Sequence, residues 1–148
     1  MKHAALIGLL LVSGCAATHE VKFSADDVKV ESWESVDPAD MNAQITEAVT
    51  SGEDWPASPM EATIHLLGSD GDTRIVRLDE SKNRTEGADS TVVVLIRDGF
   101  LDDSVRGDWH KIVYALQADR TWRIQSLQRA FRCYRGQNLE SYSRVRCP

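Results

Sequence analysis

Val28, Val30 and Trp33 indicate a first strand or an extended arm. From there on, the spacing of apolar residues changes once, close to position 70. Before that point, apolar side chains recur every three to four positions over 38–51 and again over 59–67. This spacing predicts two amphipathic helices. A capping box begins the second helix at Ser58, and Gly52 and Gly68 are suited to end the two helices.

After position 70 the pattern is that of strands. In an extended chain over 74–78, Val76 and Leu78 share one face, and over 111–117 Ile112, Tyr114 and Leu116 share one face. The continuous β-branched run 91–96 is typical of a central, buried strand. The segment 122–133 is long for one strand, and its apolar phase slips near Ser126. We expect a β-bulge or a bend there.

These elements predict an α+β fold, with two N-terminal helices packed on a curved antiparallel sheet of about four strands. The nearest general architectures are the cystatin-like and nuclear-transport-factor-2-like cones, and such an analogy assigns no function. The chain has 148 residues, of which 42% are apolar and 27% charged. This composition suits one globular domain, which we place at 26–148.

Residues 1–14 are organised like an export signal, with a basic start, an apolar run over 4–12 and small residues before Cys15. The run is shorter than the roughly 20 residues that span a bilayer as a helix. Val12 to Cys15 (VSGC) resembles the lipobox of bacterial lipoproteins, and an ordinary signal peptide with a chance cysteine is the alternative. The resemblance implies acylation of Cys15, a tether over 15–25 and a membrane anchor for the domain.

Ala16 follows the expected lipidation site. In enterobacterial lipoproteins, a residue other than Asp at that position implies transfer to the outer membrane. We therefore expect a lipid-anchored protein at the outer membrane, facing the periplasm.

The chain has three cysteines, and an odd number in an exported protein requires an explanation. Lipidation of Cys15 leaves Cys133 and Cys147, which we expect to pair in an oxidising compartment. A zinc site is the competing interpretation, but the two cysteines are far apart and no His lies near them.

Charge is unevenly distributed. The chain has a net charge of −6, yet 120–148 contains seven arginines and a single acid, Glu140. An acidic chain is unsuited to nucleic acid, whose phosphates repel it. The basic end either neutralises the acidic remainder in surface contacts or forms a face that binds an anion or a partner.

The stretch 98–109 (DGFLDDSVRGDW) is predicted as one acidic loop between strands. Its carboxylates are suited to a hard cation or a basic ligand, or they cap turns of their own backbone. The spacing does not fit an EF-hand. Ser69 to Asp72 (SDGD) is interpreted as a turn.

Catalytic and cofactor motifs do not emerge from the sequence, and we expect neither cofactor nor metal. His65 and His110 lie on different predicted elements, and no nucleophile elbow surrounds any serine. The four tryptophans are interpreted as core residues or as the lining of a pocket.

Two stretches in the last part of the chain carry a resemblance to known proteins. One is DGFLDDSVRG at 98–107, and the other is WRI at 122–124, followed by FRCYRGQ at 131–137 and the final CP. Together they resemble a group of small bacterial lipoproteins. Members carry a D-G-L-x-D-D-S-V-R-G loop, a W-R strand and C-x-x-G-R-G before a last cysteine. The chain departs from the group at Gln137 and Asn138, where the group usually has Arg-Gly. The resemblance implies a lipoprotein with a terminal disulfide and no assigned activity.

We therefore expect a non-enzymatic module, tethered to the membrane through the lipid on Cys15, that binds an envelope protein or a small ligand. The alternatives are a small enzyme that uses an Asp as general base in a cone pocket, and a purely structural envelope lipoprotein. The candidate contact residues form two sets, which are Asp102, Asp103, Ser104 and Arg106, and Arg129, Arg132 and Arg135.

Overall fold

The computed structural model describes residues 28–68 and 73–148. The described chain is an α+β domain with two α-helices and a sheet of five antiparallel strands. The elements are β1 (Glu34–Val36), α1 (Ala39–Ser51), the 3-10 turn η2 (Trp55–Ala57), α2 (Pro59–Leu67), β2 (Thr73–Lys82), β3 (Ser90–Phe100), β4 (Val105–Leu116) and β5 (Trp122–Cys133).

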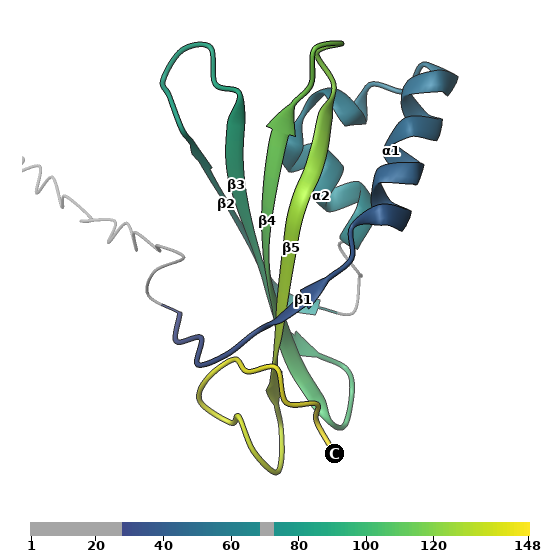
Figure 1. Cartoon of the computed structure of the whole chain (residues 1–148). Helices are drawn as coiled ribbons and strands as arrows, with labels where there is room; N and C mark the ends of the chain where they lie inside the picture. The colour runs from purple at the N-terminus through teal and green to yellow at the C-terminus, as the bar shows by residue number, and fades with distance from the viewer. Residues whose placement is uncertain (1–27, 69–72) are drawn as a thin grey trace, which may run out of the picture.

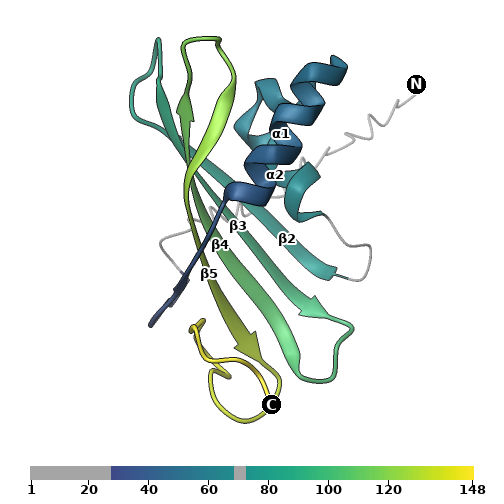
Figure 2. The same cartoon turned by 45° about the vertical axis from the view of Figure 1, so that its right-hand side comes forward.

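The sheet has the strand order β1-β5-β4-β3-β2. Strands β2 to β5 form a continuous antiparallel meander, and β1 pairs with β5 at the far edge. Both helices lie on one face of this twisted sheet, near the end that carries the β2–β3 and β4–β5 connections (Figures 1 and 2). The C-terminal segment lies at the opposite end of the sheet.

Two details of the predicted fold are corrected. The sheet has five strands rather than about four, and β1 precedes the helices, so the helices do not open the described domain. Residues Glu34 to Val36 become a strand because β5 offers them an open edge, in the register Glu34 to Arg129 and Val36 to Leu127. The sequence indicated a first strand or an extended arm at 28–33, and the strand lies just after that stretch, at Glu34–Val36.

The two predicted helices are confirmed. The second begins at Ser58, whose hydroxyl accepts a hydrogen bond from the Glu61 amide, and Pro59 occupies its first turn. Gly52 ends the first helix in the left-handed conformation, at φ 77°, which an L-residue with a side chain adopts only at a cost.

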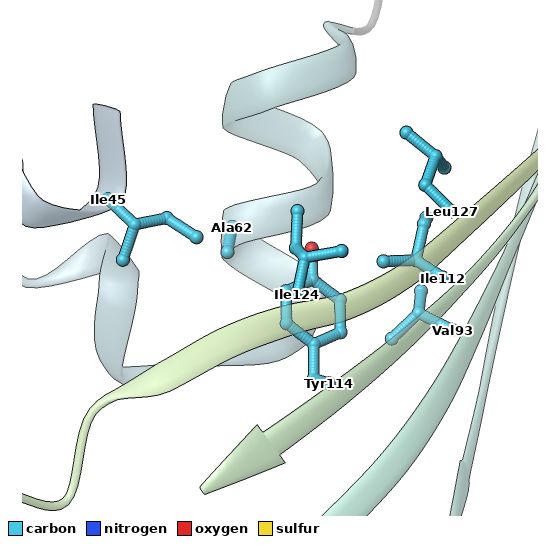
Figure 3. Close-up of a cluster of buried hydrophobic side chains, with 7 residues drawn as sticks. All are labelled: Ile45, Ala62, Val93, Ile112, Tyr114, Ile124 and Leu127. Carbon is cyan, nitrogen blue, oxygen red and sulfur yellow. The ribbon is translucent and has the colours of Figure 1, made fainter. Parts of the chain in front are cut away.

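The main core lies between the helices and the sheet. Its fully buried side chains come from both helices and from β3, β4 and β5, as Figure 3 shows. They are Ile45, Ala62, Val93, Ile112, Tyr114, Ile124 and Leu127. The Tyr114 hydroxyl lies 2.9 Å from the Thr63 hydroxyl of α2, so the polar atom of the largest core residue is satisfied.

The predicted irregularity near Ser126 is confirmed as a register shift. Val113 pairs with Ser126, but the next residue, Tyr114, pairs with Ile124, so Gln125 is the extra residue of a β-bulge. The side chain of Asn42 in α1 exchanges two hydrogen bonds of 2.9 Å with the backbone of Ile124. Helix α1 is therefore fixed to β5 at the bulge.

A second, smaller apolar cluster covers part of the opposite face of the sheet, which we call the open face. It contains Ile96, Trp109, Ala130 and Tyr142, with Val28 and Val30 packed against it. Two backbone hydrogen bonds of 2.9 Å hold the segment 28–31, called the arm below, to Tyr142: the Glu31 amide donates to the Tyr142 carbonyl, and the Tyr142 amide to the Lys29 carbonyl.

The predicted disulfide is confirmed. Cys133, the last residue of β5, is bonded to Cys147, 14 positions further along the chain. The segment between them returns along β5, where Phe131 and Ser143 exchange two backbone hydrogen bonds. The disulfide thus holds Tyr142 where it anchors the arm.

Candidate functional site

The acidic stretch 98–109 is not one loop, contrary to the prediction. Strands β3 and β4 extend into it, and only residues 101–104 connect them. Asp98 lies in β3 and Asp108 in β4. Strand pairing reaches this far because the close approach of Gly107 to the Arg97 carbonyl leaves no room for a side chain: a Cβ there would lie 2.3 Å from that oxygen.

The candidate residues of the connecting loop hold the loop itself together. Asp102 accepts hydrogen bonds from the amides of Ser104 (2.6 Å) and Val105 (2.7 Å), and these bonds lower the pKa of its carboxyl, that to Val105 most. The Ser104 hydroxyl donates to the carbonyl of Pro148, which ties the loop to the end of the chain. Asp103 is exposed and contacts Arg135 at 3.3 Å.

The candidate arginines do not form a single basic surface. Arg106 and Arg132 both bind Asp98, at 3.1 and 3.2 Å. Arg129 binds Glu34 at 2.8 Å. In the register of β4 and β5 it lies opposite His110, on the face of the sheet that carries the helices. Alternation along β5 directs Arg129 and Arg132 to opposite faces. Four of the seven arginines of 120–148 therefore pair with acids of the body of the domain, namely Arg129, Arg132, Arg135 and Arg146.

A cluster of two arginines and an aromatic ring lies beside β1. The Arg129 and Arg146 guanidinium carbons lie 5.1 and 4.4 Å from the centroid of the Phe131 ring. Both arginines also donate to the same oxygen of Glu34, at 2.8 and 2.9 Å. Cation–π contacts and one shared carboxylate thus join β1, β5 and the C-terminal segment.

A buried ion pair spans β3 and β4 on the helix side of the sheet. Arg97 donates to both oxygens of Asp108, and each side chain is 9% exposed. His110 lies next to the pair, with its Nδ1 3.8 Å from Asp108 and without a hydrogen-bond partner among the described residues. Burial lowers the pKa of His110 to about 4, although the Asp108 carboxylate opposes the shift.

These contacts bear on acid–base chemistry. The half-buried Asp98 and the buried Asp108 each accept hydrogen bonds from arginine on both carboxylate oxygens. In the described part of the chain, no three His, Cys, Asp or Glu side chains are grouped to hold a metal ion.

A groove lies on the open face, between the arm and strands β2 to β4. Its larger part has a volume of about 430 Å³. This part, called the open-face groove below, is lined by Val28, Val30, Asp79, Ser81, Val92, Val94, Trp109 and Lys111. A second hollow of about 240 Å³ adjoins it and shares Val28, and its lining includes Asp98, Arg132 and Tyr142.

The charges of the open-face groove lie on opposite sides of an apolar floor. Val94 of β3 is paired with Asp79 of β2 on one side and with Lys111 of β4 on the other. Paired residues point to the same face, so the three side chains form one row across the sheet. Within residues 28–68 and 73–148, neither Asp79 nor Lys111 has an ion-pair partner within 4.0 Å.

The sequence analysis did not nominate these groove residues, with the general exception of Trp109, one of four tryptophans. Of the four, Trp109 lines the groove, Trp55 and Trp122 pack against the main core, and Trp33 is half exposed. The available signal was Lys111, a cation at the start of the strand segment predicted over 111–117. The apolar run 91–96 gave no sign of an open face, because a continuous apolar strand predicts that both faces of the sheet are buried.

The remaining candidates are placed as follows. His65 stacks on Trp55 with ring centroids 4.2 Å apart, far from the buried His110 along the chain and on another element. Cys15, the expected lipidation site, and the predicted turn at 69–72 lie outside the described residues.

Comparison with known proteins adds no relative. No family model matches the chain, and neither the curated proteins nor the solved structures contain a match. Among the helices of the described residues, none is both long enough and apolar enough to cross a membrane. What can be said of function therefore depends on the site itself.

Proposed function

We propose that this chain is a lipid-anchored envelope protein whose domain is a non-enzymatic binding module, with the open-face groove as its ligand site. The observation that carries the proposal is the groove itself. It combines an apolar floor with two charges, Asp79 and Lys111, that have no ion-pair partner among residues 28–68 and 73–148, a composition that suits a small-molecule site. Its volume of about 430 Å³ lies within the range of such sites.

The arm links this site to the proposed anchor. Val28 and Val30 form one wall of the groove, and the chain that precedes Val28 leads towards Cys15. The lipobox resemblance at Cys15 supports acylation there, and the residue after it supports the outer membrane, facing the periplasm. The resemblance to small bacterial lipoproteins over the last part of the chain supports the same class.

The finer fold assignment is also part of this proposal. Two helices on one face of a twisted antiparallel sheet are compatible with a cystatin-like or nuclear-transport-factor-2-like cone. In such cones a ligand site is usually sought between helices and sheet. Here the space between them is filled by the main core, which favours the open face.

A charge placed in the groove tests the binding function. The full-length chain would be extracted from bacterial membranes with mild detergent, and native mass spectrometry would record any bound species. Val94→Glu puts a carboxylate on the groove floor, and Ile64→Glu puts one on the exposed side of α2, where Ile64 is 44% exposed. We expect the bound species to be lost from Val94→Glu and retained by Ile64→Glu.

The same two variants, expressed in a deletion strain, complete the test. Val94→Glu should fail to restore the envelope phenotype of the deletion, whereas Ile64→Glu should restore it. Full restoration by a folded Val94→Glu protein would overturn the groove as the site and favour a purely structural lipoprotein.

The anchor has an independent test. Intact mass of the membrane-extracted protein should show acyl chains on a chain that begins at Cys15, and Cys15→Ala should release the protein from the membrane fraction. A chain without acyl mass that begins elsewhere would contradict the anchor and leave the groove proposal standing.

A further inference from the structure

We infer that the open-face groove takes a short peptide with free termini and apolar side chains, a dipeptide being the best fit. This inference rests on the proposed binding function and names its ligand class. It follows from the sign, the spacing and the setting of the groove's polar groups.

The two charges of the groove are opposite in sign and separated. Asp79 and Lys111 are two strands apart in one row, so their Cα atoms are about 10 Å from each other, at roughly 4.8 Å per strand spacing. No ion pair joins them. A ligand that lies along the row and carries an ammonium at one end and a carboxylate at the other satisfies both.

The length of the ligand follows from the same row. An extended chain spans at most about 3.5 Å per residue, so two residues span about 7 Å. The side chains of Asp79 and Lys111 supply the remaining reach. A peptide of four or more residues spans about 14 Å when extended, which is longer than the distance between the two Cα atoms.

The floor determines the preferred side chains. Between the charged rims lie Val92 and Val94, with Trp109 beneath the arm and Val28 and Val30 on the wall. Apolar side chains of the ligand would be removed from water there, at about 25 cal/mol per Å² of apolar surface buried. Ser81, on the Asp79 side, offers a hydroxyl to the ligand's ammonium or to its peptide carbonyl.

The charges also argue against a fatty acid, the simplest amphiphile of the envelope. A fatty acid carboxylate would pair with Lys111, but it offers no hydrogen-bond donor to the exposed Asp79. A ligand that desolvates Asp79 without replacing its hydrogen bonds loses affinity. A ligand that carries both an ammonium and a carboxylate pairs with Asp79 and with Lys111.

The test uses leucyl-leucine, N-acetyl-leucyl-leucine and leucyl-leucine amide, titrated by calorimetry into the full-length protein in detergent. The acetyl group removes the positive charge and the amide removes the negative one, with little change of the apolar surface. We expect the free dipeptide to bind, and each blocked form to bind about tenfold more weakly, which is about 1.4 kcal/mol.

Variants assign each charge to its rim. Asp79→Asn should abolish the preference for a free amino group, and Lys111→Met should abolish the preference for a free carboxylate. Asp40→Asn and Lys82→Met, at exposed positions outside the groove, make the same chemical changes as controls. The controls should keep both preferences.

Two results would overturn the inference. One is equal binding of free and blocked dipeptides, and the other is no heat of binding for the free dipeptide at millimolar concentration. If native mass spectrometry meanwhile shows a bound species that Val94→Glu loses, the binding function stands and the ligand belongs to another class. If Val94→Glu changes nothing, both proposals fail together.

Discussion

Arg97 and Asp108 face each other across β3 and β4 and form two parallel hydrogen bonds, Nε to Oδ1 at 2.9 Å and Nη2 to Oδ2 at 2.6 Å. Arg97 also donates to the carbonyl of Leu67, near the end of α2. One buried guanidinium thus joins two strands and a helix end. Asp108 belongs to the stretch 98–109, which the sequence alone suggested as an acidic loop.

Breaking this pair from one side should destabilise the domain strongly. Arg97→Leu leaves the Asp108 carboxylate buried without its partner, which costs about 3–5 kcal/mol. Urea unfolding followed by tryptophan fluorescence measures the loss. Arg84→Leu is the matched control, because its pair with Asp89 is more than half exposed and such pairs contribute about 1 kcal/mol or less.

The double variant Arg97→Leu/Asp108→Leu separates the buried charge from the lost contacts. It should recover part of the stability, since no carboxylate is left unpaired. Recovery remains incomplete because the Leu67 carbonyl loses its donor. A single variant that unfolds at the wild-type urea concentration would contradict the role given to this pair.

His110 should make the stability of the domain depend on pH. Its pKa is 6.5 when exposed and about 4 when folded, so between these values the unfolded chain binds a proton that the folded chain does not. Stability from this group is therefore fully present above about pH 6.5 and is lost as the pH falls towards 4. The full difference is about 3 kcal/mol.

His110→Gln removes the titrating group and should flatten this part of the profile. The measurement is the free energy of unfolding in urea at several pH values between 7 and 4, for wild type and variant. Since carboxylates titrate over the lower part of the same range, the difference between the two profiles is the relevant quantity. Parallel profiles would show that His110 is not responsible.

The contact of Asn42 with the β-bulge should be a major attachment of α1. Its side-chain amide both donates to the Ile124 carbonyl and accepts from the Ile124 amide. Asn42→Ala leaves two backbone groups without partners and should cost about 2–3 kcal/mol. Gln44→Ala, at an exposed position of the same helix, should change stability little. The measurement is the thermal unfolding of both variants, in which only Asn42→Ala should show a clearly lower stability than the wild type.

Loss of the disulfide should loosen the arm as well as the C-terminus. Replacing Cys133 and Cys147 by serine removes a cross-link worth about 3 kcal/mol in a loop of this length. The segment that carries Tyr142 should then open locally, and the arm with it. Hydrogen exchange at the Tyr142 and Glu31 amides should accelerate together. Exchange that accelerates at Tyr142 alone would show that the arm is held independently.

Much of the fold could be predicted because its signals are local. The two helices, the meander of four strands, the bulge close to Ser126 and the disulfide were all expected, and all are present. Strand ends were predicted poorly. Strand β4 begins at Val105 instead of 111, because cross-strand pairing with β3 extends it through polar residues whose own pattern suggested a loop.

The candidate contact residues show why a binding surface could not be predicted from the distribution of charge along the sequence. Arg129 and Arg132 are three apart in sequence and suggested one basic stretch, yet strand alternation directs them to opposite faces. The structure pairs one with Glu34, 95 positions away, and the other with Asp98, 34 positions away. Pairings over such distances depend on topology, which no local pattern encodes.

The sequence by itself determined the two helices and the central parts of the four meander strands, because apolar periodicity, capping residues and turn residues act over a few neighbouring positions. It also determined the unequal charge of the two parts of the chain. Only the tertiary structure decided that β1 pairs with β5 and that four arginines of the basic end pair with acids of the domain. It also decided that the arm forms one wall of a groove with Asp79 and Lys111 on opposite rims. These features depend on which strands become neighbours, and that choice is made by the burial of the whole core at once.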